Sequence, residues 1–150
     1  MAATIGVQEL LYEETFQTTG VVDFGIDLAS ALSGAKPIPP EGLRLNVSFE
    51  GELKGPRLRG RIAGTDYILM RGDGLPQLDI HAVITTDDGA RIAFHGQGVA
   101  IGGGPTLGLR YSVRLQTAAP AYAWVNRLLV WATGESNPAT GFATLKGYAA

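Results

Sequence analysis

The sequence predicts an all-β protein: a small antiparallel up-and-down β-barrel of about eight strands with one or two short helical turns, in a single domain over residues 1–150. Three observations predict the all-β class. Apolar and polar residues alternate over short segments, as in strands with one buried face. Glycine accounts for 21 of the 150 residues and recurs between these segments, where it marks turns. Helical periodicity over more than about two turns is almost absent.

The expected strands follow one another along the chain. The first is expected over residues 9–18, and residues 43–50 show the clearest alternation of apolar and polar side chains. Further strands are expected at 57–62, 67–71, 109–116, 127–133 and 141–148, with a β-hairpin over 78–95. Short strands of this number, joined by glycine turns, are typical of a sandwich or a barrel.

Two segments do not alternate like strands. Residues 21–40 form a long, proline-containing connection, and long loops often act as lids or binding loops. Residues 120–125 begin with a proline, which suits the first position of a helix. A single helical turn there would bring Tyr122, Trp124 and Asn126 to one end of the barrel.

The hairpin over residues 78–95 is the most informative segment, and it allows two registers. A three-residue loop at 87–89 pairs Thr86 with Ala90 and places His81 opposite His95. A two-residue turn instead sends the two histidines to opposite faces. We favour the three-residue loop because it leaves the other face uniformly apolar. That face then consists of Leu78, Ile80, Ala82, Ile84, Ile92 and Phe94.

The polar face of this hairpin carries the candidate catalytic residues Asp79, His81 and His95. Histidine titrates near neutral pH, so paired imidazoles suit general acid–base catalysis, with Asp79 orienting His81. The alternative is that this face is simply the solvated outer wall of the barrel. Two histidines and one aspartate lack a fourth ligand, so we expect no metal site, and nothing in the sequence calls for a cofactor.

Candidate substrate-binding residues come from an arginine-rich segment and from the aromatic residues. Arginines at 57, 59 and 61 would line one strand face, where Arg59 in particular could bind a carboxylate or polarise a carbonyl group. The alternative is that they are solvated or paired with acidic residues. The expected pocket wall at the barrel mouth consists of Tyr67, Tyr111, Tyr122, Trp124 and Asn126. The same aromatic residues would also serve as ordinary core packing.

Composition excludes several classes of function. A net charge of −2 gives no reason to expect nucleic acid or an anionic membrane as a partner. The absence of cysteine excludes disulfides and zinc–thiolate sites. The first fourteen residues are acidic, unlike a signal peptide, and no apolar run approaches the ~20 residues of a membrane span, so a cytoplasmic location is expected. The glycine clusters do not precede a helix in a βαβ unit, which excludes a dinucleotide-binding motif.

Several segments in a fixed order carry a resemblance to a known family. They are Gly-Pro-Arg-Leu-Arg-Gly-Arg at 55–61, Leu-Asp at 78–79, Thr-Asp-Asp-Gly-Ala at 86–90, Pro-Ala-Tyr-Ala-Trp-Val-Asn-Arg at 120–127 and Thr-Gly at 133–134. Over about residues 51–148 the chain resembles the DUF3237 (UPF0311) family. The resemblance implies a small antiparallel barrel similar to the lipocalin-like group, often oligomeric, without an assigned function. The family usually reads Asp-Ala-Arg-Tyr where this chain has Asp79-Ile80-His81-Ala82, so a titrating histidine replaces a permanent cation.

These observations lead to three hypotheses of function. The first is a cofactor-independent lyase or isomerase acting on a small hydrophobic oxygenated molecule, including aromatic ones, held in the barrel. His81 or His95 would move the proton, and Arg59 or Asn126 would stabilise the developing negative charge. The second is a non-catalytic small-molecule carrier. The third is an oligomeric structural or interaction module.

The position of the face bearing His81 distinguishes these hypotheses. If that face lines a closed cavity, catalysis is favoured. A carrier should have a mainly apolar cavity without coupled titrating groups, and an interaction module should have a filled barrel. If the polar face points inward, the apolar face of the hairpin must be covered from outside. We therefore expect a homo-oligomer, with a second subunit covering that face.

Overall fold

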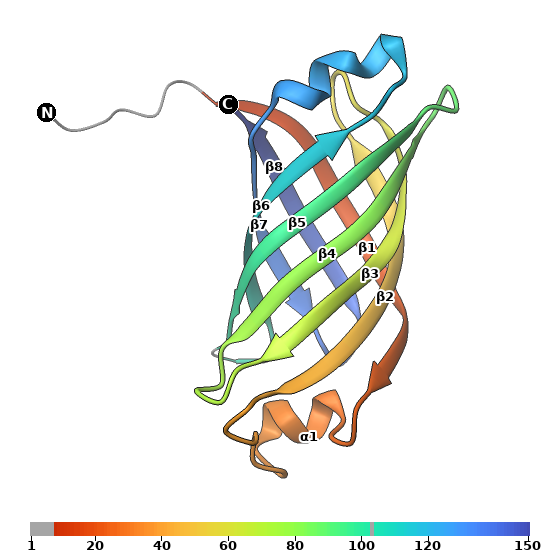
Figure 1. The fold of residues 1–150 in the computed structure, drawn as a ribbon. Coiled ribbons are helices and arrows are strands. Elements are labelled where there is room, and N and C mark those ends of the chain that lie inside the picture. Colours follow the sequence, from red (N-terminus) through yellow and green to blue (C-terminus); the bar gives the residue numbers. More distant parts are fainter. Residues whose placement is uncertain (1–7, 103) are drawn as a thin grey trace, which may run out of the picture.

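The chain folds into one closed β-barrel, as the sequence predicts. The computed structural model describes residues 8–102 and 104–150. Each strand pairs antiparallel with the next one along the chain, and the last pairs with the first (Figure 1). In order the strands are β1 (Glu9–Asp23), β2 (Leu43–Lys54), β3 (Gly60–Met70), β4 (Pro76–Thr86), β5 (Arg91–Ile101), β6 (Leu107–Gln116), β7 (Val130–Asn137) and β8 (Phe142–Ala149).

Two short helices lie at opposite ends of the barrel (Figure 1). Helix α1 (Leu28–Ser33) follows β1 within the long connection. At its N-terminus the Asp27 side chain accepts a hydrogen bond from the main-chain N–H of Ser30, and at its C-terminus Gly34, in the left-handed conformation, ends the helix. The 3₁₀ helix η1 (Pro120–Arg127) begins at the proline predicted to start a helical turn. Among the described residues no helix has the length and apolar character needed to cross a membrane.

Several expected strand boundaries were wrong. The segments 57–62 and 67–71 belong to one strand, β3, because the intervening residues continue the ladder with β2. Arg57 and Arg59 precede this strand, so the three arginines do not share a strand face. Arg61 alone lies in β3, where its guanidinium is 3.7 Å from the carboxylate of Glu52 on β2. The strand expected from residue 127 begins at Val130, because η1 extends to Arg127.

The β4–β5 hairpin has the predicted three-residue loop. The N–H of Thr86 donates to the carbonyl of Ala90 at 2.8 Å, and Gly89 adopts the left-handed conformation with φ 91°. His81 therefore lies opposite His95. The apolar face of the hairpin points into the barrel, where Ile84 and Ile92 are fully buried.

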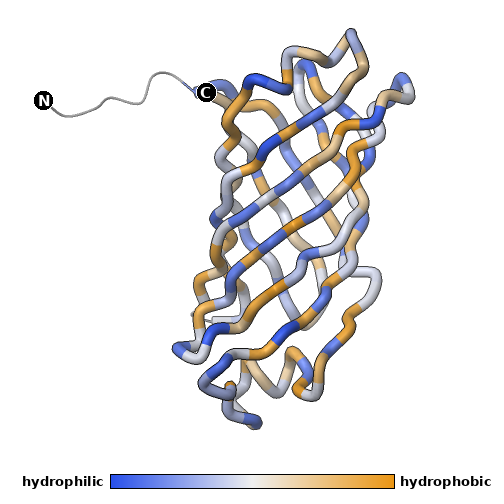
Figure 2. The backbone as a smooth tube through the Cα atoms, in the orientation of Figure 1, coloured by the Kyte–Doolittle hydropathy of each residue, from blue (hydrophilic) through white to orange (hydrophobic). Residues whose placement is uncertain are grey.

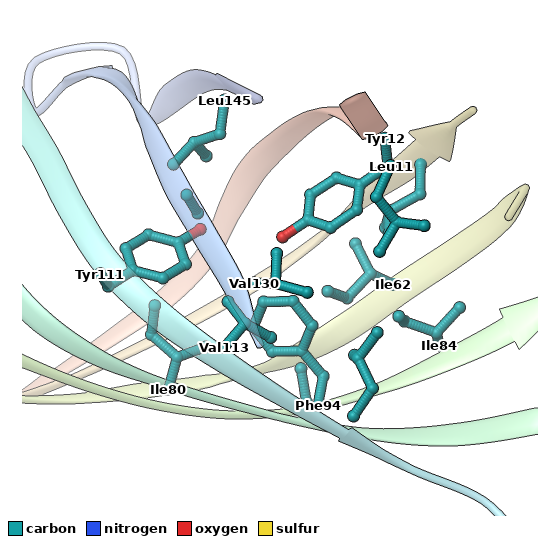
Figure 3. Packing of buried hydrophobic residues seen from close by; sticks show 14 of the residues in the cluster. Leu11, Tyr12, Ile62, Ile80, Ile84, Phe94, Tyr111, Val113, Val130 and Leu145 are labelled. Atoms are coloured by element: carbon teal, nitrogen blue, oxygen red, sulfur yellow. The ribbon is translucent and has the colours of Figure 1, made fainter. Parts of the chain in front are cut away.

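The barrel interior is mostly apolar because the alternation seen in the sequence places one face of every strand inside. Figure 2 shows this alternation of apolar and polar residues along the strands. Towards η1 the interior is filled by packed side chains, including Ile62, Val113 and Val130 (Figure 3). The apolar face of the hairpin is thus covered within one chain, and the reason given above for expecting a second subunit no longer holds.

Candidate functional site

A cavity of about 130 Å³ lies inside the barrel, towards the end that α1 covers. Its wall is mostly apolar, with Phe49, Ile68 and Phe94 contributed by the strands and Leu28 and Leu32 contributed by α1. An engineered apolar cavity of about 150 Å³ binds benzene, so this space suits a ligand built on a single ring. Three ionisable side chains also line the cavity, and they come from three different strands.

Glu14 is the first of these side chains. It points inward from β1 between Tyr12 and Phe16, and only 2% of its surface is exposed. Its Oε1 atom has no hydrogen-bond partner among the described residues. Burial raises the pKa of Glu14 to about 8, because the ionised form would lose its hydration inside the barrel. The group is therefore mostly a neutral carboxylic acid at pH 7.

Asp66 is the second ionisable side chain in the cavity wall. It faces the cavity from β3, and its carboxylate accepts a hydrogen bond of 3.0 Å from the main-chain N–H of Asp79 on β4. Burial raises the pKa of Asp66 to about 7; the hydrogen bond from Asp79 opposes this shift, and the negative charge of Asp79 adds to it. At neutral pH both protonation states of Asp66 are populated, as a general base requires.

The third is Tyr111, which enters the cavity from β6. Burial, and then the nearby Glu14, raise the pKa of Tyr111 well above its ordinary value, so its phenol stays protonated. Tyr12 lies on the facing wall, and its fully buried hydroxyl group has no partner among the described residues. Figure 3 shows the hydroxyl groups of Tyr12 and Tyr111 pointing into the same central space. The interior thus holds hydrogen-bonding groups that no described residue satisfies.

The predicted catalytic residues come together, but on the outside of the barrel. The Nε2 atoms of His81 and His95 lie 3.3 Å and 2.9 Å from Oδ1 of Asp79, and the two ring centroids are 4.4 Å apart. The three side chains are 42–54% exposed. Partial burial opposes ionisation of Asp79, but the hydrogen bonds from His95 and His81 hold its pKa below the ordinary value. Since β4 and β5 direct their other face inward, this cluster does not face the cavity.

Among the predicted binding residues, Tyr111 lines the cavity and Tyr67 does not. Tyr67 is 41% exposed on the outer wall, where its ring meets the edge of His81 at a centroid distance of 5.6 Å. Arg59 lies in the loop before β3, and its carbonyl accepts the N–H of Asp87 at 3.1 Å. Neither Tyr67 nor Arg59 can reach a ligand inside the barrel.

The other three predicted binding residues belong to η1, at the end away from the cavity. The Tyr122 hydroxyl donates to Asp88 at 2.8 Å, and the guanidinium of Arg57 lies 4.0 Å above the Trp124 ring. The Asn126 side chain accepts from the N–H of Thr117 at 2.8 Å and donates to its carbonyl at 2.9 Å. These contacts hold η1 over the filled end of the barrel, so they are structural.

Sequence reasoning missed Glu14 and Asp66. A signal was present for both. Each carboxylate occupies one of the alternate positions of its strand that point into the barrel. Glu14 lies between Tyr12 and Phe16, and Asp66 lies two residues before Ile68. A single acidic residue among inward-facing apolar positions is costly to bury, and it often marks a functional group.

Comparison with known proteins agrees with this architecture. The family described as "Protein of unknown function (DUF3237)" matches residues 21–149, and no curated protein matches the chain. A protein of unknown function from Clostridium acetobutylicum is 21% identical, with 97% of this chain and 99% of that chain covered and a TM-score of 0.79. A β-barrel-like protein from Acinetobacter baumannii (18% identical, TM-score 0.74) and an enzyme from Penicillium herquei (18% identical, TM-score 0.64) each match over 99% of both chains. At these identities the likeness shows the shared fold.

Proposed function

This chain belongs to the DUF3237 family of proteins of unknown function, and from its own geometry we propose that it is a cofactor-independent lyase or isomerase. Its substrate would be a small hydrophobic oxygenated molecule bound inside the barrel. One observation carries the proposal: two carboxyl groups with pKa values raised to about 7 and about 8 line the same mostly apolar cavity. Carboxyl groups tuned towards neutral pH in a cavity are typical of acid–base catalysis.

The two carboxyl groups suit different roles. Asp66, ionised in part at neutral pH, takes a proton from an acidic C–H or O–H group of the substrate. Glu14, still protonated, gives its proton to an oxygen or carbon atom elsewhere on the same molecule. Asp66 then holds a proton and Glu14 a negative charge, and proton exchange restores both. The Tyr111 hydroxyl, within the same cavity, donates a hydrogen bond to the oxyanion that develops.

This assignment moves the proposed chemistry from the histidines to the interior. The roles first given to His81, His95 and Asp79 require an inward face, and these side chains project outward. Likewise Arg59 and Asn126 lie away from the cavity, so Tyr111 takes the oxyanion role. The overall hypothesis is unchanged: acid–base catalysis without a cofactor in an enclosed barrel.

The carrier hypothesis remains the second candidate, supported by the apolar wall. Apolar surface with few polar groups is enough to bind a small molecule without converting it. A carrier has no need of carboxyl groups in the cavity wall, where the loss of hydration of their charged forms weakens the fold at neutral pH. The existence of an enzyme with this barrel fold in Penicillium herquei is compatible with the catalytic hypothesis. An interaction module requires no cavity at all.

Deuterium exchange into a single-ring ketone tests the proposal. We expect acetophenone to bind in the cavity, as measured by calorimetry, and its methyl protons to exchange for deuterium in D₂O faster than in buffer. Asp66→Asn removes the base and should reduce this exchange by at least about a hundredfold. Glu14→Gln should also slow it. Glu13→Gln, an exposed neighbour on β1, is the matched control and should exchange like the wild type.

The two candidate functions give different results. Binding without exchange, unchanged by Asp66→Asn, supports a carrier and contradicts catalysis. If neither acetophenone nor other single-ring ketones and phenols bind, the cavity is not a ligand site and both hypotheses fail.

A further inference from the structure

Asp79, His81 and His95 form a second polar cluster on the outer wall, separate from the cavity. Thr86 and Ala90 form a hydrogen-bonded pair, and hydrogen-bonded and non-hydrogen-bonded pairs alternate along an antiparallel ladder. His81 and His95 are therefore a non-hydrogen-bonded pair, the kind whose side chains lie closest. Asp79 lies two residues before His81 on the same face. The sequence offers no fourth protein ligand and therefore predicted no metal site, but water can occupy a fourth position; from the observed geometry we infer that these three side chains bind a divalent transition-metal ion such as Zn²⁺.

The distances between the ligand atoms fit this inference. One ligand atom from each of the three residues lies within 4.8 Å of the others. In a tetrahedral zinc site, with bonds of about 2.0–2.1 Å, neighbouring ligand atoms are separated by about 3.3 Å. The Asp79 Oδ1 atom is 3.3 Å from Nε2 of His81 and 2.9 Å from Nε2 of His95. A metal ion therefore needs only small side-chain rotations to bind all three atoms.

The surroundings hold the ligands in place. The Tyr67 ring packs edge-on against His81, and the main-chain N–H of Asp79 is bonded to Asp66. Both contacts restrict the backbone or the ring before a metal binds, which lowers the entropy lost on binding. A metal ion here would be held by the unprotonated Nε2 atoms of the two imidazoles and by the ionised carboxylate of Asp79, because metal ligands bind in their deprotonated forms.

The type of site follows from the ligands and their exposure. Imidazole nitrogens favour zinc, copper, nickel or iron over the oxygen-seeking ions magnesium and calcium. All three side chains are partly exposed, so a hydrated ion reaches them without opening the barrel. Three protein ligands leave a position for water, as in catalytic zinc sites. Arg114, the cross-strand partner of His95 on β6, adds a positive charge to the same outer face of the barrel.

The composition of the chain makes the test unusually clear. These are its only two histidines, and it has no cysteine. After removal of metal with EDTA, the full chain is titrated with ZnCl₂ at a pH of about 7.5, because metal binding requires deprotonated ligands. We expect one zinc ion per chain by calorimetry. In NMR spectra of the imidazole groups, both histidines should shift together on zinc addition, while MgCl₂ should leave them unchanged.

Variants identify the ligands. His81→Ala and His95→Ala should each weaken zinc binding by more than about tenfold, because removing a ligand costs at least as much as removing one of its supporting contacts. Asp79→Asn should also weaken it. Gln97→Ala, which removes the residue opposite Asp79 on the same face, is the control and should bind like the wild type. Circular dichroism confirms that each variant is folded.

Two results would overturn the inference. One is a wild-type spectrum in which neither imidazole shifts at saturating zinc, a result that needs no variant. The other is wild-type zinc affinity in both folded histidine variants, which would place the metal elsewhere. Neither result bears on the cavity, whose function is tested separately by deuterium exchange.

Discussion

The main-chain N–H of Asp79 donates a 3.0 Å hydrogen bond to the carboxylate of Asp66. This bond joins the two polar sites of the protein, because Asp66 lines the cavity while the Asp79 side chain meets the histidines outside. The ladder between β3 and β4 is interrupted between the residue pairs Asp66–Ile80 and Leu69–Gln77. In this gap the Asp66 carboxylate, rather than a main-chain carbonyl, accepts the hydrogen bond from the N–H of Asp79. Asp66 therefore has a structural role as well as its proposed chemical one.

Substitutions of Asp66 should separate these two roles. Asp66→Ala leaves the N–H of Asp79 without its acceptor and should destabilise the fold by about 1–3 kcal/mol, measured by urea denaturation. Asp66→Asn keeps an oxygen acceptor at the same position and should be clearly more stable than the alanine variant. Equal stabilities for the two variants would show that the hydrogen bond contributes nothing.

Stability should fall as the pH rises from about 4.5 to about 8. Over this range the unfolded chain releases the Glu14 proton, whereas the folded chain keeps it because burial raises the pKa of Glu14 to about 8. The unfolded state binds fewer protons, so the free energy of unfolding decreases by up to about 1.4 kcal/mol per pH unit. Asp66, with its pKa raised to about 7, contributes in the same direction over a slightly lower range.

Glu14→Gln should flatten this profile, because the amide does not titrate. We expect the variant to be more stable than the wild type at a pH of about 8 and to lose that advantage near the ordinary glutamate pKa, about 4.3. Urea denaturation across this pH range measures the effect. Glu13→Gln, which changes an exposed carboxylate on the same strand, should leave the slope unaltered. If the free energy of unfolding of Glu14→Gln depends on pH as steeply as that of the wild type, burial does not raise the pKa of Glu14.

Gly147→Ala should destabilise the barrel by about 1–3 kcal/mol through overpacking. A Cβ atom at this position would collide with the ring of Tyr12, which is fully buried against it. The same substitution should cost much less in a Tyr12→Leu background, where the ring is absent. Denaturation of the two single variants and the double variant measures this coupling. Equal costs in both backgrounds would contradict the proposed collision.

Gly89→Ala should cost about 1–2 kcal/mol, because a side chain at φ 91° is strained. Apart from Gly89 and its two chain neighbours, no described residue has a heavy atom within 4 Å of the position that a Cβ atom would occupy, so the cost arises from the backbone alone. Gly20→Ala also places its Cβ in open space but without a positive φ, and it should change the melting temperature little. Similar melting temperatures for the two variants would contradict this account of the turn.

The strands and the central hairpin could be predicted from local patterns, whereas the choice of a barrel over a sandwich came from the family resemblance. Alternation with a period of two assigns side chains to the faces of each strand wherever it is regular, as in residues 43–50. The hairpin register was predicted from one further requirement. The apolar residues on both sides of the glycine turn, from Leu78 to Phe94, had to lie on the same face of the hairpin. The bounds of β3 were harder to predict, because Gly64, Thr65 and Asp66 interrupt the alternation of apolar and polar residues along this strand.

The sequence by itself determined the all-β class and favoured the hairpin register that pairs His81 with His95, because these depend on neighbours within one or two strands. Only the tertiary structure decided which polar residues meet inside. Glu14 and Asp66 lie on strands separated by β2, and they reach one cavity with Tyr111 only because the sheet closes. Closure also directs the apolar face of each strand inward, which places the histidines on the outer wall. Proximity across a closed barrel depends on the whole set of registers, and no local segment contains that information.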